Sequence, residues 1–368
     1  MPSNFGSYLN ISIFGESHGK AIGVVIGNLP PGEKIDEEEL SVFLQRRAGG
    51  NNAYSTKRKE PDVVKILSGL YRGRTSDSPL CAVIENLDTR EGDYASLAQT
   101  PRPGHADFPA FVKSDGYADP RGGGHFSGRL TAPLCIAGGI LLQMLRRRGI
   151  TIGAHISAIG SIEDSSFHSV SVTPEELLQV SQKEFPTIDD ALGEDMKKLI
   201  LQAAEKNDSV GGKVECFVLG LPAGLGLPVF EGLENKIASC VFAIPAVKGI
   251  DFGAGFEATA MLASEHNDAY LLSGGGSIRT KTNHHGGILG GLSTGMPLYF
   301  KAAFKPTPSI AQEQKTIDLQ SMRETTISIH GRHDPCVVLR AVPAIESAAA
   351  IAVMDLLLLQ KHLLLKKQ

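Results

Sequence analysis

Residues 9–19 read Leu9-Asn10-Ile11-Ser12-Ile13-Phe14-Gly15-Glu16-Ser17-His18-Gly19, a strand-like segment that ends in a turn framed by glycines. Residues 21–27 are strand-like again. Two strands joined by so short a turn pair in antiparallel fashion. The start of the chain is therefore predicted to form an antiparallel sheet, with Ser17 and His18 on the tight loop between its first two strands.

Four further segments carry the signals of helices. Asp36 is a suitable N-cap for a helix over residues 36–47. Residues 131–148 are apolar at helical spacing and end in three arginines before a glycine, which marks a helix C-terminus. Residues 173–176, Thr-Pro-Glu-Glu, form a capping box with proline at the first helical position. The last and longest helix is predicted over residues 343–365.

The remaining strand-like segments do not alternate with these helices in a regular βαβ rhythm. They are residues 63–68, 80–84, 214–219 and 298–304. This arrangement favours an α+β fold with antiparallel sheets over a doubly wound parallel sheet. No low-complexity linker divides the chain, so we expect one domain over residues 1–368.

The composition is that of a globular protein with enough chain for a large core. It is 42% hydrophobic and 21% charged, with a formal net charge of -4, which gives no general attraction to nucleic acid. The five cysteines form no C-x-x-C pair, which is typical of a reducing cytosol. No signal peptide is apparent, Glu346 and Asp355 interrupt the apolar C-terminal stretch, and no metal-binding spacing occurs. We therefore expect a cytoplasmic protein with no metal and no membrane span.

The turn at residues 15–19 can be interpreted in two ways. As G-x-S-x-G it is the nucleophile elbow of a serine hydrolase, with Ser17 as the nucleophile. As a glycine-framed histidine it holds His18 as a proton donor, without serine chemistry. Too little chain precedes Ser17 to supply the oxyanion segment of a hydrolase, which favours the second interpretation. A plain turn remains the alternative without function.

Four more segments concentrate Gly, Arg, His and Asp in loops. They are residues 46–52, 102–107, 121–129 and 331–336. Their arginines suit carboxylates and phosphates, because a guanidinium group donates two hydrogen bonds to one anion. His105 can exchange a proton near neutral pH. Each segment also has a structural interpretation: a solvated helix end, a turn histidine bonded to Asp107, a surface loop and a surface ion pair.

Together these segments resemble, in the same order, the signature segments of the chorismate synthase family. The resemblance rests on Gly15–Gly19, Gly104–Asp107, the loop from Gly122 to Arg129 and Gly331–Cys336, and it extends from Phe5 to Asp355. It implies a β-α-β sandwich with helices between antiparallel sheets. It also implies a 1,4-anti elimination that converts 5-enolpyruvylshikimate 3-phosphate into chorismate and phosphate, the last common step of the shikimate pathway of aromatic amino acid biosynthesis.

The resemblance further implies a requirement for reduced FMN (FMNH2), although the reaction has no net redox change. It implies catalytic roles for His18, His105 and Asp334, and substrate binding by Ser17, Arg47, Arg129 and Arg340. It implies flavin contacts by His125, Phe126, Ser127, Pro245, Ala246, Gly290, Lys305, Pro306, Thr307, Pro308, Ser309 and Arg332. The substrate anions would explain the arginines, and the flat cofactor would explain the glycines.

The chain departs from the family pattern at three positions. Many family members have an arginine where this chain has His125 and an alanine where it has Gly128. Many also have, close to the position of Ala53, an arginine that is associated with pyridine-nucleotide binding. The chain carries no segment that would supply an integral flavin reductase. We therefore expect a homotetramer that depends on an external flavin reductase system. The alternatives are a non-catalytic protein that binds flavin or phosphate, and a serine hydrolase.

Overall fold

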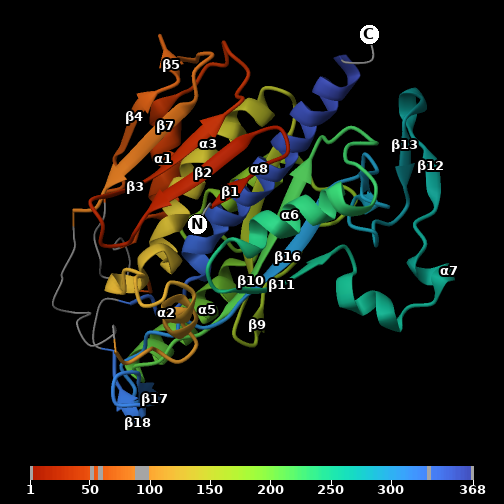
Figure 1. Ribbon diagram of the computed structural model, residues 1–368. Helices are drawn as coiled ribbons and strands as arrows, with labels where there is room; N and C mark the ends of the chain where they lie inside the picture. Colours follow the sequence, from red (N-terminus) through yellow and green to blue (C-terminus); the bar gives the residue numbers. More distant parts are fainter. Residues whose placement is uncertain (1–2, 50–53, 57–60, 88–98, 330–332, 366–368) are drawn as a thin grey trace.

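Two five-stranded antiparallel sheets enclose a layer of helices (Figure 1). The computed structural model describes residues 3–49, 54–56, 61–87, 99–329 and 333–365. Most buried apolar side chains form one continuous core between the sheets and the helices. The predicted β-α-β sandwich of the α+β class is confirmed.

The first sheet has the strand order β1-β2-β3-β7-β4, and every neighbouring pair is antiparallel. Its central strand β3 is fully buried at Ile22, Val24 and Ile26, which face the helix layer. The strands are β1 (Asn4–Phe5), β2 (Asn10–Gly15), β3 (Ala21–Gly27), β4 (Val64–Ser68) and β7 (Leu80–Glu85). The pairing of β2 with β3 that the sequence predicted is confirmed.

The second sheet has the order β11-β16-β10-β8-β9, again with antiparallel pairs throughout. Its strands are β8 (Thr151–Ile159), β9 (Ile162–Glu163), β10 (Gly212–Leu219), β11 (Val247–Phe252) and β16 (Leu298–Phe304). Strand β8 is buried on both faces and therefore lacks the polar alternation of a half-exposed strand. It was not predicted from the sequence.

Helices α1 (Glu37–Arg47), α3 (Thr131–Arg146), α6 (Leu233–Phe242) and α8 (Val338–Leu365) fill the space between the sheets. Two adjacent glycines of α3 set their spacing. A Cβ atom on Gly138 would lie 2.1 Å from the Ser347 Cβ of α8, and one on Gly139 would lie 2.6 Å from Leu40 of α1. The helices can approach this closely only because both positions lack a side chain.

The helix predictions agree with the structure, with one correction. Asp36 caps α1 by accepting a hydrogen bond from the Glu39 amide, and the capping box at Thr173 begins α4 (Pro174–Ser181). Helix α8, however, begins at Val338 and not at Pro343. A proline so near the start of a helix removes only one backbone hydrogen bond, so the helix continues through it.

The other elements lie outside the helix layer. Helices α4 and α5 (Asp190–Glu205) pack on β8 from the outer side of the second sheet. Helix α7 (Ala263–His266) and the hairpin of β12 (Tyr270–Leu272) and β13 (Ile278–Thr280) project from the body (Figure 1). The rest are α2 (Asp107–Lys113), β5 (Leu70–Tyr71), β6 (Arg74–Thr75), β14 (Ile288–Leu289), β15 (Leu292–Ser293), β17 (Gln314–Asp318) and β18 (Arg323–Ile327), with short 3-10 turns between them.

Two helical stretches, Gly128–Arg146 and Val338–Leu364, are long and apolar enough to cross a membrane. The structure buries 83% and 89% of their most apolar windows inside the protein. This burial is what the core helices of a sandwich require, so their apolar composition is explained without a lipid environment.

Candidate active site

A cavity of about 870 Å³ opens where α3 and α8 begin and α1 ends. It gathers residues from all five chemistry-bearing segments of the sequence: Ser17, Arg47, His105, Arg129 and Asp334 line it. These residues are up to 317 positions apart in the chain, from Ser17 to Asp334. The loops that end the strands and begin the helices thus converge on one site.

The triple-glycine loop packs directly on both predicted catalytic histidines. A Cβ atom on Gly122 would lie 2.4 Å from the His18 ring, and one on Gly123 would lie 2.8 Å from the His105 ring. Both glycines have positive φ, at 61° and 93°. The glycines therefore serve the close approach of this loop to the two imidazoles, a role the sequence did not suggest. His18 lies beneath the loop and is not among the residues that line the cavity.

Ser17 and His18 are both buried in the turn after β2. The Ser17 amide donates to the Gly124 carbonyl at 3.1 Å, which ties this turn to the triple-glycine loop. Within the described part of the chain, Ser17 Oγ has no hydrogen-bond partner. Asp119 lies near His18: the hydrogen bond from Arg121 lowers the pKa of Asp119, and the charge of His18 lowers it further.

His105 is held by a buried ion pair. Its Nδ1 lies 2.5 Å from Asp107 Oδ1, and Arg102 donates to both oxygens of Asp107 at 2.7 Å. Although burial alone would raise the pKa of Asp107, the hydrogen bonds from Arg102 and His105 lower it well below its usual range. Arg102 also donates to Ser309 Oγ at 3.0 Å. The structural interpretation of His105 is thus correct about its partner, and the bond orients a histidine that faces the cavity.

Three arginines of the cavity lining meet around one buried carboxylate. Arg47 and Arg129 each donate to Asp62, one to each carboxylate oxygen. Burial alone would raise the pKa of Asp62, but the charges of Arg47 and Arg129 lower it. Burial lowers the pKa of Arg47 to about 10, against the attraction of Asp62. Arg340 donates to the Arg47 carbonyl at 3.0 Å and completes the group.

Asp334 is fixed on both of its oxygens. Oδ1 accepts the Thr56 amide at 2.9 Å, and Oδ2 accepts Arg340 Nη1 at 2.6 Å. Its side chain is 13% exposed and lines the cavity. The loop that carries Asp334 is therefore no isolated surface turn, because Asp334 pairs with Arg340. Arg332 lies outside the described residues.

Most of the predicted flavin contacts also line this cavity. They are His125, Phe126, Ser127, Pro245, Ala246, Lys305, Thr307, Pro308 and Ser309. Pro306 is not among the lining residues, and Gly290 lies exposed at the tip of the β14–β15 hairpin, outside the cavity. Ala53 and Arg332 fall outside the described residues. The assignments of Pro306, Gly290 and Arg332 remain predictions.

Two lysines add positive charge to the part of the cavity that the predicted flavin contacts line. Burial lowers the pKa of Lys305, and the nearby charge of Lys248 lowers it further. Lys248 lines the same cavity and was not identified from the sequence. Thr307 Oγ1 is buried and, in the part of the chain that the structure describes, has no hydrogen-bond partner. Two adjacent cations and an unpartnered hydroxyl fit a phosphate-bearing cofactor such as FMN.

His125, which replaces the common arginine, is satisfied within the protein. Its Nδ1 lies 2.8 Å from the Gly15 carbonyl, and its Nε2 lies 2.6 Å from Ser3 Oγ. A carbonyl only accepts, so Nδ1 donates to Gly15, and Nε2 shares a hydrogen bond with the Ser3 hydroxyl. His125 thus ties the start of the chain and the end of β2 to the triple-glycine loop.

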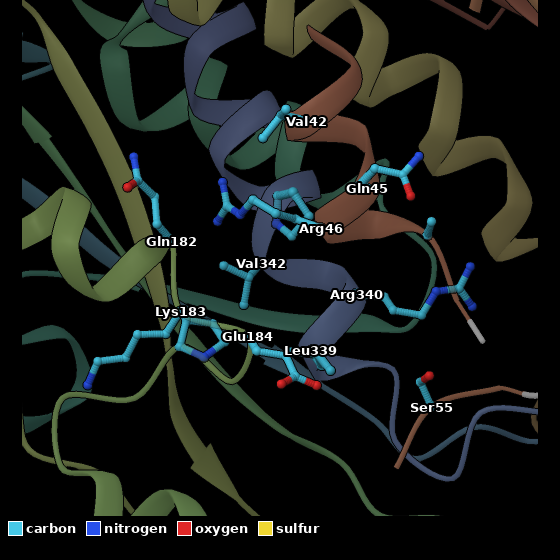
Figure 2. A pocket seen from close by; sticks show the side chains of 13 residues that line it. Val42, Gln45, Arg46, Ser55, Gln182, Lys183, Glu184, Leu339, Arg340 and Val342 are labelled. Carbon is cyan, nitrogen blue, oxygen red and sulfur yellow. The ribbon is translucent and has the colours of Figure 1, made fainter. Parts of the chain in front are cut away.

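A second, smaller cavity of about 240 Å³ lies on the other side of Arg340, between α1, the start of α8 and residues 182–186 (Figure 2). Its cations already have carboxylate partners. Arg46 pairs with Glu346, Lys183 with Asp190, and Arg340 with Asp334. In the larger cavity Arg47 has a donor group without a partner among the described residues, so this cavity is the better site for an anionic ligand.

The sequence did not identify Asp62, Arg102 or Lys248 as parts of the site. Arg102 could have been found, because it stands in the same motif as His105. Asp62 gave no signal: it follows a proline in an irregular segment and adopts a left-handed backbone with φ of 48°. Lys248 is one exposed lysine among many and is distinguished only by its position.

The fold and the cavity define an α+β protein whose site combines two fixed histidines, a held carboxylate and a buried arginine cluster. Comparison with known proteins gives the family. The sequence profile of the family described as "Chorismate synthase" matches residues 9–358. The chain belongs to the chorismate synthase family and is therefore a carbon–oxygen lyase of the shikimate pathway.

Individual relatives support this assignment. The chain is 47% identical to a chorismate synthase of Thermococcus kodakarensis, covering 96% of this chain and 97% of the relative. It is 46% identical to one of Lancefieldella parvula, covering 97% and 96%. A solved structure titled "Crystal Structure of Chorismate Synthase" superposes with a TM-score of 0.74 at 27% identity, covering 97% of this chain and 93% of the other. The serine hydrolase and non-catalytic alternatives are not favoured.

Proposed function

We propose that the large cavity binds reduced FMN together with 5-enolpyruvylshikimate 3-phosphate and catalyses a 1,4-anti elimination to chorismate and phosphate. The observation that carries the proposal is that His105, Asp334 and a cluster of arginines line one cavity, with His18 packed against the glycine loop at its edge. A volume of about 870 Å³ lies within the usual range for a ligand pocket and is large for a single small ligand.

The arginine wall supplies the attraction for the substrate, which carries two carboxylates and a phosphate. Arg47, Arg129 and Arg340 are opposed by Asp62 and Asp334, so the group keeps a surplus of one positive charge. A buried cationic donor without a partner is costly. The Nη2 of Arg47 is buried and has no partner among the described residues, so it is a donor suited to a substrate anion.

The protein side chains handle the protons. In this proposal His18 protonates the departing phosphate, and Asp334 assists removal of the C6 proton while Arg340 and Thr56 hold it in place. His105, oriented by Asp107, stabilises negative charge at the cofactor edge. Ser17 contributes a positioning hydrogen bond only.

Lys248, Lys305, Thr307 and Ser309 would hold the cofactor phosphate, and Phe126, Pro245 and Ala246 would contact its ring system. Reduced FMN supplies electron density that assists cleavage of the carbon–oxygen bond and is recovered at the end of the reaction. Since the reaction consumes no electrons, an external flavin reductase system is needed only to generate and maintain the reduced cofactor. We further propose a single-domain chain, residues 1–368, that acts as a cytoplasmic homotetramer.

Phosphate release under anaerobic conditions tests the proposal. The protein is incubated with dithionite-reduced FMN and substrate, and phosphate and chorismate are measured. We expect stoichiometric formation of both with no net oxidation of the flavin. Turnover with oxidised FMN in the strict absence of reductant would contradict the cofactor requirement. Flavin binding without any turnover would favour a non-catalytic binding protein.

A further inference from the structure

Asp62 lies directly behind two of the arginines that face the cavity. Its side chain is fully buried and accepts Nη1 of Arg47 on one oxygen and Nη1 of Arg129 on the other. The Nε of each arginine donates to a neutral side chain, Thr131 Oγ1 at 3.0 Å and Asn86 Oδ1 at 3.1 Å respectively. Each guanidinium group is thus held at its Nε and its Nη1, and the two groups share the carboxylate of Asp62.

Among the described residues, the arrangement leaves one donor of Arg47 without a hydrogen-bond partner. Arg47 and Arg129 line the cavity, whereas Asp62 does not. The Nη2 of Arg47 is buried and, among the residues that the structure describes, has no hydrogen-bond partner. Because Nε and Nη1 are occupied, Nη2 is the group of Arg47 that remains to meet a ligand. An anion bound there would complete the hydrogen bonds that the protein itself leaves unmade.

We propose that Asp62 is a positioning residue for the substrate, which aligns Arg47 and Arg129 so that both grip one anionic group. This inference rests on the proposed function, since it takes that anion to belong to 5-enolpyruvylshikimate 3-phosphate. Asp62 itself does not touch the substrate. Its contribution is geometric: one carboxylate fixes the distance and the relative orientation of two guanidinium groups that would otherwise repel each other.

Two effects of Asp62 oppose each other, and this makes the inference testable. The negative charge of Asp62 by itself weakens the attraction of the site for an anion. Its alignment of the arginines strengthens that attraction. Neutralising the residue therefore lowers the KM for substrate if only charge matters, and raises it if alignment is the larger effect. We infer that alignment is the larger effect.

The experiment compares full-length wild-type protein with Asp62→Asn and Asp62→Glu, assayed with excess reduced FMN. Asn keeps the shape of the side chain and tolerates the left-handed backbone of residue 62, and Glu keeps the charge but moves the carboxylate by one methylene. We expect the KM of Asp62→Asn to rise at least about tenfold, the size of one lost charge-assisted hydrogen bond. The kcat and the Kd for FMN should change by less than about threefold, and the KM of Asp62→Glu should also rise.

Asp355→Asn is the matched control. Asp355 is an equally buried aspartate that accepts the amides of Ser7, Tyr8 and Leu9, outside the cavity lining. Its substitution should lower stability and leave KM unchanged. A KM that falls or stays constant in folded Asp62→Asn overturns the inference, and if that variant does not fold, an unchanged KM of Asp62→Glu does so. Absence of wild-type turnover would instead refute the proposed function.

Discussion

Two buried clusters of charge, one at the cavity and one under the outer face of the second sheet, differ in the balance of their charges. We call the outer cluster closed, because its His155 and Lys301 are matched by the carboxylates of Asp164 and Glu215. In the outer cluster His155 lies between two carboxylates, with Nε2 2.8 Å from Glu215 and Nδ1 3.3 Å from Asp164. Asp164 also accepts the amides of Ile188 and Asp189, and Lys301 lies 3.7 Å from Glu215. At the cavity, two arginines share the carboxylate of Asp62, and within the described part of the chain Arg47 has a donor without a hydrogen-bond partner.

The difference separates a structural network from a binding site. Both clusters are buried, and both shift the pKa values of their members. Among the described residues, only the cavity cluster has more cations than carboxylates and lies beside a space that can hold a ligand. There Arg47 Nη2 lacks a hydrogen-bond partner, whereas the unbonded nitrogen of the outer cluster, His155 Nδ1, still has Asp164 3.3 Å away. A buried charged cluster therefore does not by itself identify a site; an unsatisfied donor at a cavity does. Changes at the cavity should affect activity, and changes at His155 should affect folding.

The largest expected effect is on turnover, at the histidines under the glycine loop. If His18 and His105 each handle a proton or developing charge, replacing either with Ala should lower kcat by roughly 10²–10⁴-fold. Thermal stability should change little in His18→Ala, and FMN binding, followed by fluorescence quenching, should persist. Full activity of His18→Ala would mean that the Gly15–Gly19 turn has only a structural role.

The next effect should appear in stability and not in turnover. Replacing His155 with Ala leaves Asp164 and Glu215 buried without their shared partner. Breaking a buried ion pair in this way costs about 3–5 kcal/mol. We expect a loss of this size in urea unfolding, with kcat of the folded variant near the wild-type value. A large fall in kcat with stability intact would show that the outer cluster is coupled to the site.

These two clusters also show which parts of the molecule could be predicted from the sequence. The glycine-framed turn, the strand pair β2–β3 and the arginine motifs were predicted, because turn residues and alternating apolar residues act locally. Asp62 and Asp164 could not be found, because each acts through partners far away in the chain. Asp62 meets Arg129 across 67 positions, and Asp164 accepts the amides of Ile188 and Asp189 across 24 and 25 positions. No local pattern encodes such pairings.

The fold shows the same limit. Strand β8 is a continuous apolar run, and such runs do not distinguish strands from buried helices. The start of α8 was placed too late because proline usually marks a helix boundary, whereas here it falls in the second turn. The β-α-β layering itself came from the family resemblance, since periodicity predicts elements and not how they stack.

A smaller effect compares two residues within the cavity. Asp334 should act as a base relay, and Ser17 should provide only a hydrogen bond worth about 0.5–1.5 kcal/mol, at most roughly tenfold in rate. We therefore expect Asp334→Asn to reduce kcat at least about ten times more than Ser17→Ala, with little change in substrate Kd. Both variants are assayed side by side with excess reduced FMN. An inactive Ser17→Ala beside an active Asp334→Asn would reverse the roles assigned here.

The smallest effect should be a pH dependence that belongs to the closed cluster alone. Burial alone would lower the pKa of His155, but its hydrogen bonds to Asp164 and Glu215 raise it above the usual value. A group whose pKa is raised by folding contributes stability that is fully present below its unfolded pKa, about 6.5, and is lost as pH rises through the folded pKa. Asp164 behaves in the opposite sense: burial would raise its pKa, but the bond to His155 lowers it, so its contribution is lost only in acid.

The free energy of unfolding of the wild type, measured in urea from pH 5 to pH 10, should therefore fall on the alkaline side by about 1.4 kcal/mol for each unit by which the pKa of His155 is raised. His155→Asn lacks the titrating group, so the difference between wild type and variant should be largest near pH 5 to 6 and should shrink as pH rises. The matched comparison is Asp62→Asn, whose difference from the wild type should stay constant from pH 5 to about pH 8. The lowered pKa of Asp62 keeps its carboxylate ionised there, and its partner Arg47, with a pKa of about 10, remains charged. A wild-type minus His155→Asn difference that is flat from pH 6 to pH 10 would mean that His155 is neutral in the folded protein. The outer cluster would then carry a net negative charge. The two clusters would differ in the sign of their net charge and not in whether their charges are matched.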